Sequence, residues 1–220
     1  MNPVCKLCQS PTVEAYLSHR QSLYHACGTC QLIFKDENCL ISEEEELAIY
    51  NCHQNSIDDP CYVAYFNRFL EHAVFPYVSK SSSKKGFDYG SGPSPVLAQI
   101  LERDYGYQMD IYDLFYAPKN PCEGKKYDLV TCTEVVEHLQ DPLTLFHLFR
   151  QLLKPDGILA VMTQFHHNDL SHFQNWHYVR DRSHIAFYTP VTMGYLANQA
   201  GLKVLYTDSE RYTTLHALHT

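Results

Sequence analysis

The chain is most informative where it reads Gly86-Phe87-Asp88-Tyr89-Gly90-Ser91-Gly92-Pro93-Ser94-Pro95, a short apolar segment that runs into a turn rich in glycine and proline. Gly90 and Gly92 allow the backbone to turn tightly and to approach a ligand closely. A helix that begins after such a turn offers its first amide groups to negative charge. The pattern therefore predicts a strand, a turn and a helix at the ligand-binding end of an α/β sheet.

Strand and helix patterns alternate along the chain around this segment. We expect strands at 86–89, 107–112, 127–132, 158–163, 202–206 and 212–218. We expect helices at 59–78, 93–103, 141–153 and 189–201, with residues 154–157 ending the third of them. Alternation with short loops predicts a parallel, doubly wound α/β sheet.

The composition excludes several classes of protein. The 220 residues are 45% hydrophobic and 19% charged, which is ordinary for a globular protein and excludes a disordered, collagen-like or coiled-coil chain. No apolar stretch approaches about 18 residues, so no membrane span is expected. Residues 1–10 lack the apolar core of a secretory signal, which favours a cytoplasmic location. A net charge of −8 disfavours general nucleic-acid binding.

Four of the nine cysteines have the spacing of a zinc site. Cys5, Cys8, Cys27 and Cys30 form the pattern C-x2-C-x18-C-x2-C, which is typical of four thiolates around one ion. A segment of about 35 residues buries too little apolar surface to fold alone, so bound Zn²⁺ would supply folding energy. We therefore predict a structural zinc ribbon at 1–38. A redox-active cysteine pair is disfavoured because neither pair follows a strand of a thioredoxin-like unit. A catalytic zinc site is disfavoured because four thiolates leave no open coordination position.

An acidic residue follows the second predicted strand. Asp113 comes directly after Tyr112, where a carboxylate can accept hydrogen bonds from both hydroxyls of a nucleotide ribose. Asp110, earlier in the strand, is the competing candidate. Pro95 stands where a dinucleotide fingerprint has its third glycine, which argues against an NAD-dependent oxidoreductase.

Two further motifs complete a family pattern. They are Tyr127-Asp128-Leu129-Val130-Thr131-Cys132-Thr133-Glu134-Val135-Val136-Glu137-His138 and Leu153-Lys154-Pro155-Asp156-Gly157-Ile158-Leu159. Together with residues 88–92 and Asp113, they resemble the class I S-adenosylmethionine-dependent methyltransferases over about residues 60 to 220. Similar E-V-x-E-H motifs occur in quinone-biosynthesis and sugar methyltransferases. A zinc ribbon ahead of this domain also resembles the sugar C-methyltransferases.

The resemblance implies a Rossmann-like sheet of seven strands whose last strand is antiparallel. We divide the chain into a ribbon at 1–38, a connector with helices at 39–85 and a methyltransferase domain at 86–220. Asp88 would orient the amino group of S-adenosylmethionine, Asp113 would hold its ribose, and Glu134 would lie beside the sulfonium. The cofactor-binding residues implied are Asp88, Tyr89, Gly90, Gly92, Asp113, Cys132 and Glu134.

Residues 164–188 contain five of the thirteen histidines and lie between two predicted elements of the sheet domain. We expect this segment to cover the acceptor site. A general base for methyl transfer needs a pKa near neutrality, which points to histidine first. The catalytic candidates are His166, His167, Tyr178, Asp181 and His184. Each is also compatible with a purely structural role in a loop, and the sequence leaves that alternative open.

The sequence thus predicts an enzyme that transfers a methyl group from S-adenosylmethionine to an oxygen, nitrogen or carbon atom of a small-molecule acceptor. The alternative is a methyltransferase-like binding module whose zinc ribbon recruits a protein or nucleic-acid partner. Pro93 and Pro95 motivate this alternative because they stiffen the predicted cofactor loop.

Overall fold

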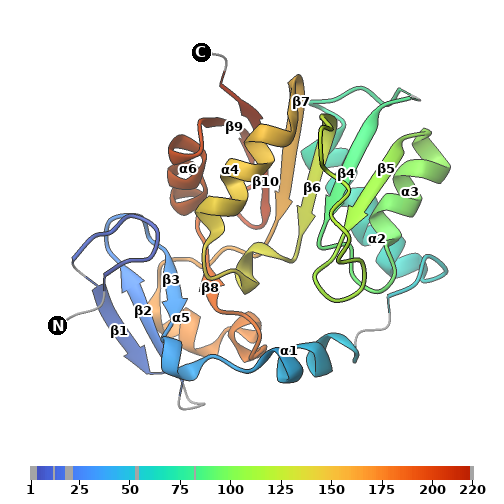
Figure 1. Cartoon of the computed structure of the whole chain (residues 1–220). Coiled ribbons are helices and arrows are strands. Elements are labelled where there is room, and N and C mark those ends of the chain that lie inside the picture. Colours follow the sequence, from blue (N-terminus) through green and yellow to red (C-terminus); the bar gives the residue numbers. More distant parts are fainter. Residues whose placement is uncertain (1–3, 12, 18–21, 53–54, 82, 219–220) are drawn as a thin grey trace.

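The computed structural model describes residues 4–11, 13–17, 22–52, 55–81 and 83–218. Figure 1 shows a larger α/β part beside a small N-terminal sheet, with helix α1 (Glu43–Tyr50) running along one side between them. Within these ranges, no helix is long and apolar enough to cross a membrane.

The larger sheet has six strands in the order β5-β4-β6-β7-β10-β9. They are β4 (Lys85–Tyr89), β5 (Gln108–Tyr112), β6 (Tyr127–Thr133), β7 (Leu153–Met162), β9 (Leu202–Thr207) and β10 (Tyr212–Ala217). Strand β4 pairs in parallel with β5 and β6, and β6 with β7. Strand β10 is antiparallel to both of its neighbours. The predicted doubly wound sheet with an antiparallel last strand is confirmed.

The expectation of a seventh strand is wrong for the described part of the sheet. Residues 113–126, between β5 and β6, contain an isolated bridge between Asp113 and Ala117 instead of a further strand and helix. Strands β5 and β6 lie on either side of β4, so residues 113–126 have to cross over β4 to join them. A parallel crossover alone takes about a dozen residues, so no room is left for another strand–helix unit.

Helices cover both faces of this sheet. Helices α4 (Pro142–Leu152) and α6 (Pro190–Gln199) pack on one face, through buried residues such as Phe146, Phe149 and Leu196. On the other face lie α2 (Pro60–Phe69), the π-helical turn η2 (Leu70–Val74) and α3 (Val96–Tyr105). The expected helix at 59–78 thus forms as α2 and η2.

Local side-chain bonds explain where these helices begin. Asp141 accepts a hydrogen bond from Thr144 N before α4, and Thr189 and Thr192 cap each other reciprocally before α6. Helix α1 (Glu43–Tyr50) begins with a capping box between Ser42 and Glu45. The starts of α4 and α6 agree with the expected helices at 141–153 and 189–201, because each capping residue is a neighbour along the chain.

Two expected boundaries are wrong. The helix expected at 93 begins at Val96, because Pro95 takes the N-cap position without a capping side-chain bond. Residues 154–157 lie within β7 rather than between two elements. The register shifts there, since Tyr127 pairs with Leu153 while Leu129 pairs with Ile158. A Cβ on Gly157 would lie 2.6 Å from Tyr127 O, so this irregularity requires glycine.

The N-terminal sheet depends on the larger part of the chain. Strands β1 (Val13–Leu17), β2 (Leu23–Cys27) and β3 (Ile33–Lys35) are antiparallel, and the 3₁₀ turn η1 (Glu37–Cys39) follows them. The fourth strand is β8 (Ala186–Phe187), which comes from the segment 164–188 and pairs with β3. The same segment forms α5 (Leu170–Asn175) and the 3₁₀ turn η4 (His177–Arg180).

Phe187 is fully buried in the apolar cluster that joins β8 to the N-terminal sheet, with its ring against Tyr24 and Phe173. We expect Phe187→Ala to lower the free energy of unfolding by about 3–5 kcal/mol, measured by chemical denaturation, because it leaves a cavity. The control is Val191→Ala, which alters a half-exposed side chain and should change stability by less than about 0.5 kcal/mol. Equal effects of the two changes would contradict this description of the interface.

Candidate functional site

A cavity of about 850 Å³ lies at the carboxyl ends of β4, β5 and β6. Its volume falls within the range of about 300–1,000 Å³ that is usual for small-molecule sites. Residues that follow these strands line one side, and helices α1 and α2 contribute Tyr50, Tyr62 and Tyr65 to the lining. Asp181 and His184 of the segment 164–188 also reach it.

The turn after β4 is held by its surroundings. Gly90 and Gly92 have φ angles of +82° and +68°, in the left-handed region that favours glycine. The amides of Gly90 and Ser91 donate to Tyr112 O at 2.8 and 3.1 Å. A Cβ on Gly90 would lie 2.1 Å from Cγ2 of Val135, so both backbone angle and space require glycine there.

The carboxylate of Asp113 ties this turn to the end of β5. Its Oδ2 accepts from Gly92 N at 2.9 Å, and its Oδ1 accepts from Phe115 N and Tyr116 N at 2.9 and 3.0 Å. Asp110, the competing candidate, instead forms an ion pair with Lys125 and accepts from the Tyr127 hydroxyl. Asp113 lines the cavity and Asp110 does not.

Two buried polar groups belong to the same wall. Asp88 is 2% exposed, and its Oδ1 accepts from Thr131 Oγ1 at 2.7 Å. Burial, reinforced by the charge of Asp113, raises the pKa of Asp88 to about 6. Ser91 also lines the cavity, and its Oγ is buried without a hydrogen-bond partner. These groups retain hydrogen-bonding capacity for a ligand.

Glu134 lies at the end of β6 with a positive φ angle of +52°, which is strained for a residue other than glycine. Its carboxylate accepts hydrogen bonds from the hydroxyls of Tyr65 and Tyr178 at 2.7 and 2.8 Å. The same hydroxyl is within hydrogen-bond distance of Glu137 Oε1, so the two carboxyl groups share its single hydrogen. Burial and the two nearby carboxylates raise the pKa of Tyr178, so this phenol remains a protonated donor. Tyr178 does not line the cavity itself.

Asp181 and His184 are the predicted catalytic residues that face the cavity. His184 Nδ1 donates to Tyr178 O at 2.7 Å, and its Nε2 lies 3.8 Å from Asp181 Oδ2. Burial lowers the pKa of His184, so the ring is neutral near pH 7. Burial opposes ionisation of Asp181, but hydrogen bonds from Ser183 and the neighbouring His184 hold its pKa below the usual value.

The structure places three other predicted site residues away from the cavity. His166 is buried against the N-terminal sheet, with Nε2 2.9 Å from Gln31 O, and burial lowers its pKa to about 4. His167 is exposed, and its ring contacts His172. Cys132 is fully buried inside β6. Sequence proximity to a cavity residue does not fix side-chain direction, because neighbours in a strand or loop point to different sides.

Sequence reasoning missed the tyrosines of α2. In the helix expected at 59–78, the three- and four-residue spacing of Tyr62 and Tyr65 with Phe66 and Phe69 is typical of a core-facing side, and Phe69 is fully buried. Tyr62 and Tyr65 instead line the cavity. The signal that distinguishes them is the hydroxyl group, since a buried tyrosine normally requires a hydrogen-bond partner and Tyr65 finds one in Glu134.

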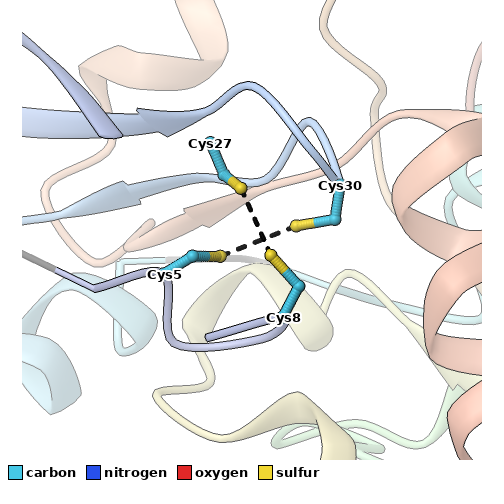
Figure 2. Close-up of side chains that lie close together, drawn as sticks. All are labelled: Cys5, Cys8, Cys27 and Cys30. Atoms are coloured by element: carbon cyan, nitrogen blue, oxygen red, sulfur yellow. Dashed lines mark hydrogen bonds between the residues drawn. The ribbon is translucent and has the colours of Figure 1, made fainter. Parts of the chain in front are cut away.

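The four predicted zinc ligands converge. Figure 2 shows the side chains of Cys5, Cys8, Cys27 and Cys30 pointing toward a common centre from two facing turns. The Sγ atoms of Cys5 and Cys30 are 3.6 Å apart and those of Cys8 and Cys27 3.3 Å apart, with all four within 4.8 Å. Four thiolates bound to one Zn²⁺ at about 2.3 Å would have similar separations, so the donor set fits the ion.

Curated relatives match a central part of the chain. The ubiquinone biosynthesis O-methyltransferase of Actinobacillus pleuropneumoniae serotype 5b is 32% identical over 81 residues, which cover 36% of this chain and 35% of that protein. The enzyme of the same name from Haemophilus ducreyi is 48% identical over 42 residues, covering 19% and 18% of the two chains. The longer of these matches thus spans about a third of the relative.

Solved structures share the fold. Mitomycin 7-O-methyltransferase has a TM-score of 0.52 at 16% identity, with 80% of this chain and 67% of that chain covered. An O-methyltransferase family protein from Burkholderia thailandensis has a TM-score of 0.53 at 18% identity, with 70% and 55% covered. A family model described as a methyltransferase domain matches residues 62–207. The chain therefore belongs to the methyltransferase-domain family, and its motif-based assignment to the class I S-adenosylmethionine-dependent type is confirmed.

Proposed function

We propose that this chain transfers the methyl group of S-adenosylmethionine to a small-molecule acceptor. The observation that carries the proposal is an acidic cavity at the end of the sheet where this family's motifs meet. One guanidinium, that of Arg68, and six carboxyl groups line it among the described residues. The carboxyl groups belong to Glu46, Asp59, Asp88, Asp113, Glu134 and Asp181. A sulfonium with an amino-acid ammonium group is a cation, which such a cavity favours.

The residues present fit this cofactor. The buried carboxyl of Asp88 would accept from the amino group, and the unpartnered Ser91 Oγ offers a further polar contact. No atom lies within 4 Å of an added Cβ at Gly92, so a ligand has room there. Asp113 Oδ2 uses one hydrogen bond for Gly92 N and can accept another from a ribose hydroxyl. The cofactor supplies a methyl group that is already activated by the sulfonium.

The protein then mainly has to align the reacting groups and exclude water. Alignment of acceptor, methyl group and sulfur can contribute roughly 7–11 kcal/mol in favourable cases. Tyr50, Tyr62 and Tyr65 form a cover from α1 and α2. On the acceptor side, neutral His184 is placed to take a proton at Nε2, and the carboxylate of Asp181 would stabilise the resulting imidazolium. We carry Asp181 and His184 forward as acceptor-side residues.

We infer that the acceptor is a small molecule with an apolar body and a hydroxyl group. Aromatic side chains such as Tyr89, Tyr112 and Phe115 line the cavity and suit an apolar body. The curated relatives are named O-methyltransferases, which supports oxygen as the methylated atom. These names and the acidic cavity do not favour the alternative of a binding module for protein or nucleic acid. The cytoplasmic location stays a prediction.

We also propose that the N-terminal sheet is a structural zinc ribbon. The converging thiols of Cys5, Cys8, Cys27 and Cys30 support this proposal. Cys30 O accepts a hydrogen bond from Thr192 Oγ1 of α6 at 2.9 Å, and β3 pairs with β8. An ion held there would stabilise the ribbon and the segment 164–188 that carries Asp181 and His184.

Asp113→Ala should weaken binding of S-adenosylhomocysteine by about tenfold or more, measured by isothermal titration calorimetry. The change removes the proposed ribose contact and frees the amide of Gly92. Asp110→Ala is the matched control, because it removes a carboxylate of β5 that lies three residues earlier and outside the cavity. This variant should bind S-adenosylhomocysteine with the affinity of the unchanged protein. Unchanged affinity in Asp113→Ala, or a lack of cofactor binding by the unchanged protein, would rule out the proposed function.

The pH dependence of cofactor binding should follow Asp88. Because its pKa is raised to about 6, its carboxyl takes up a proton as the pH falls through about 6. A bound ammonium group favours the ionised form, so affinity should be greatest above pH 7 and fall by up to about tenfold per unit below pH 6. Asp88→Asn should weaken binding at pH 7.5 and flatten the profile. A profile with the same slope in this variant would assign the titration to another group.

The purified protein should contain about one zinc ion per chain, measured by elemental analysis. Cys5→Ser should lose this zinc and lower the melting temperature, because the ion supplies folding energy to a small sheet. Cys52→Ser is the control, since Cys52 is exposed and outside the cluster, and it should retain the metal. Full zinc content in Cys5→Ser would exclude the ribbon assignment.

A further inference from the structure

A second set of metal-ligating side chains lies beside the cavity. Glu137 and His138 belong to the 3₁₀ turn η3 (Val136–His138) after β6, and His184 belongs to the segment 164–188. One ligand atom from each of the three residues lies within 4.8 Å of the other two. His138 and His184 line the cavity, whereas Glu137 is fully buried. Residues from two distant parts of the chain thus converge at the acceptor side.

The carboxylate of Glu137 lacks a partner for one oxygen. The other oxygen, Oε1, accepts a hydrogen bond from the Tyr178 hydroxyl. Oε2 is buried and has no hydrogen-bond partner. An unsatisfied buried carboxylate oxygen is costly, and such groups in native proteins are normally paired or bound to an ion. This oxygen belongs to the carboxylate that lies beside the two histidines.

Both histidines are oriented by backbone carbonyl groups. His138 Nδ1 lies 3.1 Å from Ser183 O, and His184 Nδ1 lies 2.7 Å from Tyr178 O. A carbonyl oxygen only accepts, so each Nδ1 carries a hydrogen and each neutral ring has its lone pair at Nε2. Histidines that bind metals usually donate their second ring nitrogen in this way, which fixes the ring and its tautomer.

The surrounding charges favour a cation at this place. Asp181 Oδ2 lies 3.8 Å from His184 Nε2, and Glu134 is joined to Glu137 through the shared donor Tyr178. Among the described residues, the charged groups in the lining of the cavity are six carboxyl groups and one guanidinium, that of Arg68. An ion of charge +2 would compensate carboxylates that otherwise repel one another.

We propose that Glu137, His138 and His184 bind one divalent transition-metal ion of the Zn²⁺, Fe²⁺ or Co²⁺ type. Two imidazoles and one carboxylate are the donor set that such ions prefer. Three protein ligands leave coordination positions open, and the two histidines face the cavity. The ion would bind an acceptor oxygen there and lower the pKa of the bound hydroxyl, so His184 Nε2 would then serve as a ligand in place of the proton acceptor. This role, unlike metal binding itself, rests on the proposed function.

The test uses full-length protein brought to one zinc ion per chain, to which Co²⁺ is added. We expect about one further equivalent of cobalt per chain, with visible d–d absorption and without the strong thiolate-to-cobalt charge-transfer band. Absence of a bound second equivalent, or its appearance with the thiolate band, would overturn the proposal. The thiolate band would place the cobalt in the cysteine cluster.

Variants locate the site. Glu137→Gln keeps the shape of the side chain, and His184→Asn keeps a group able to donate to Tyr178 O. Each should weaken cobalt binding by at least about tenfold. His177→Gln, an exposed histidine of the same segment, is the control and should bind cobalt as the unchanged protein does. Equal cobalt affinity in all variants would refute the site. Binding of S-adenosylhomocysteine, measured in parallel, reports on the fold and tests the proposed function separately.

Discussion

One carboxylate organises the ligand-binding end of this protein. Asp113 accepts three backbone N–H groups, one from Gly92 and two from the residues that follow β5. These bonds fix the turn after β4 against the end of β5, in a conformation that glycine alone adopts without strain at Gly90 and Gly92. The position of the cavity wall therefore depends on a short side chain that bridges two loops, and the cofactor would meet a preorganised surface rather than a flexible one.

Negative charge held in a partly buried cavity is the second constraint. Burial raises the pKa of Asp88 to about 6 and that of Glu137 well above its usual range, because charged carboxylates are poorly solvated there. Tyrosine hydroxyls partly compensate, as Tyr65 and Tyr178 do for Glu134. The remaining excess of negative charge favours the binding of cations. A sulfonium cofactor and a divalent ion would both reduce it.

The N-terminal sheet and the segment 164–188 stabilise each other. Strand β8 completes the sheet by pairing with β3, and His166 bonds to Gln31 O across the same boundary. Asp181 and His184 lie just before β8 and line the cavity, so the pairing of β8 with β3 holds the backbone that follows them. A ribbon stabilised by metal at residues 5–30 would thus help to position Asp181 and His184, which lie far away along the chain, without itself contacting the acceptor.

The sequence by itself determined what short-range chemistry controls: six strands of the larger sheet, the helices that begin after Asp141 and Thr189, the glycine turn and the spacing of the cysteines. Only the tertiary structure decided which side chains share a site. It turned His166 toward the N-terminal sheet, brought His184 beside Glu137, and placed the tyrosines of α2 over the cavity. The physical reason is that caps and turns involve neighbours along the chain, whereas side-chain direction depends on long-range strand pairing and burial that periodicity does not encode.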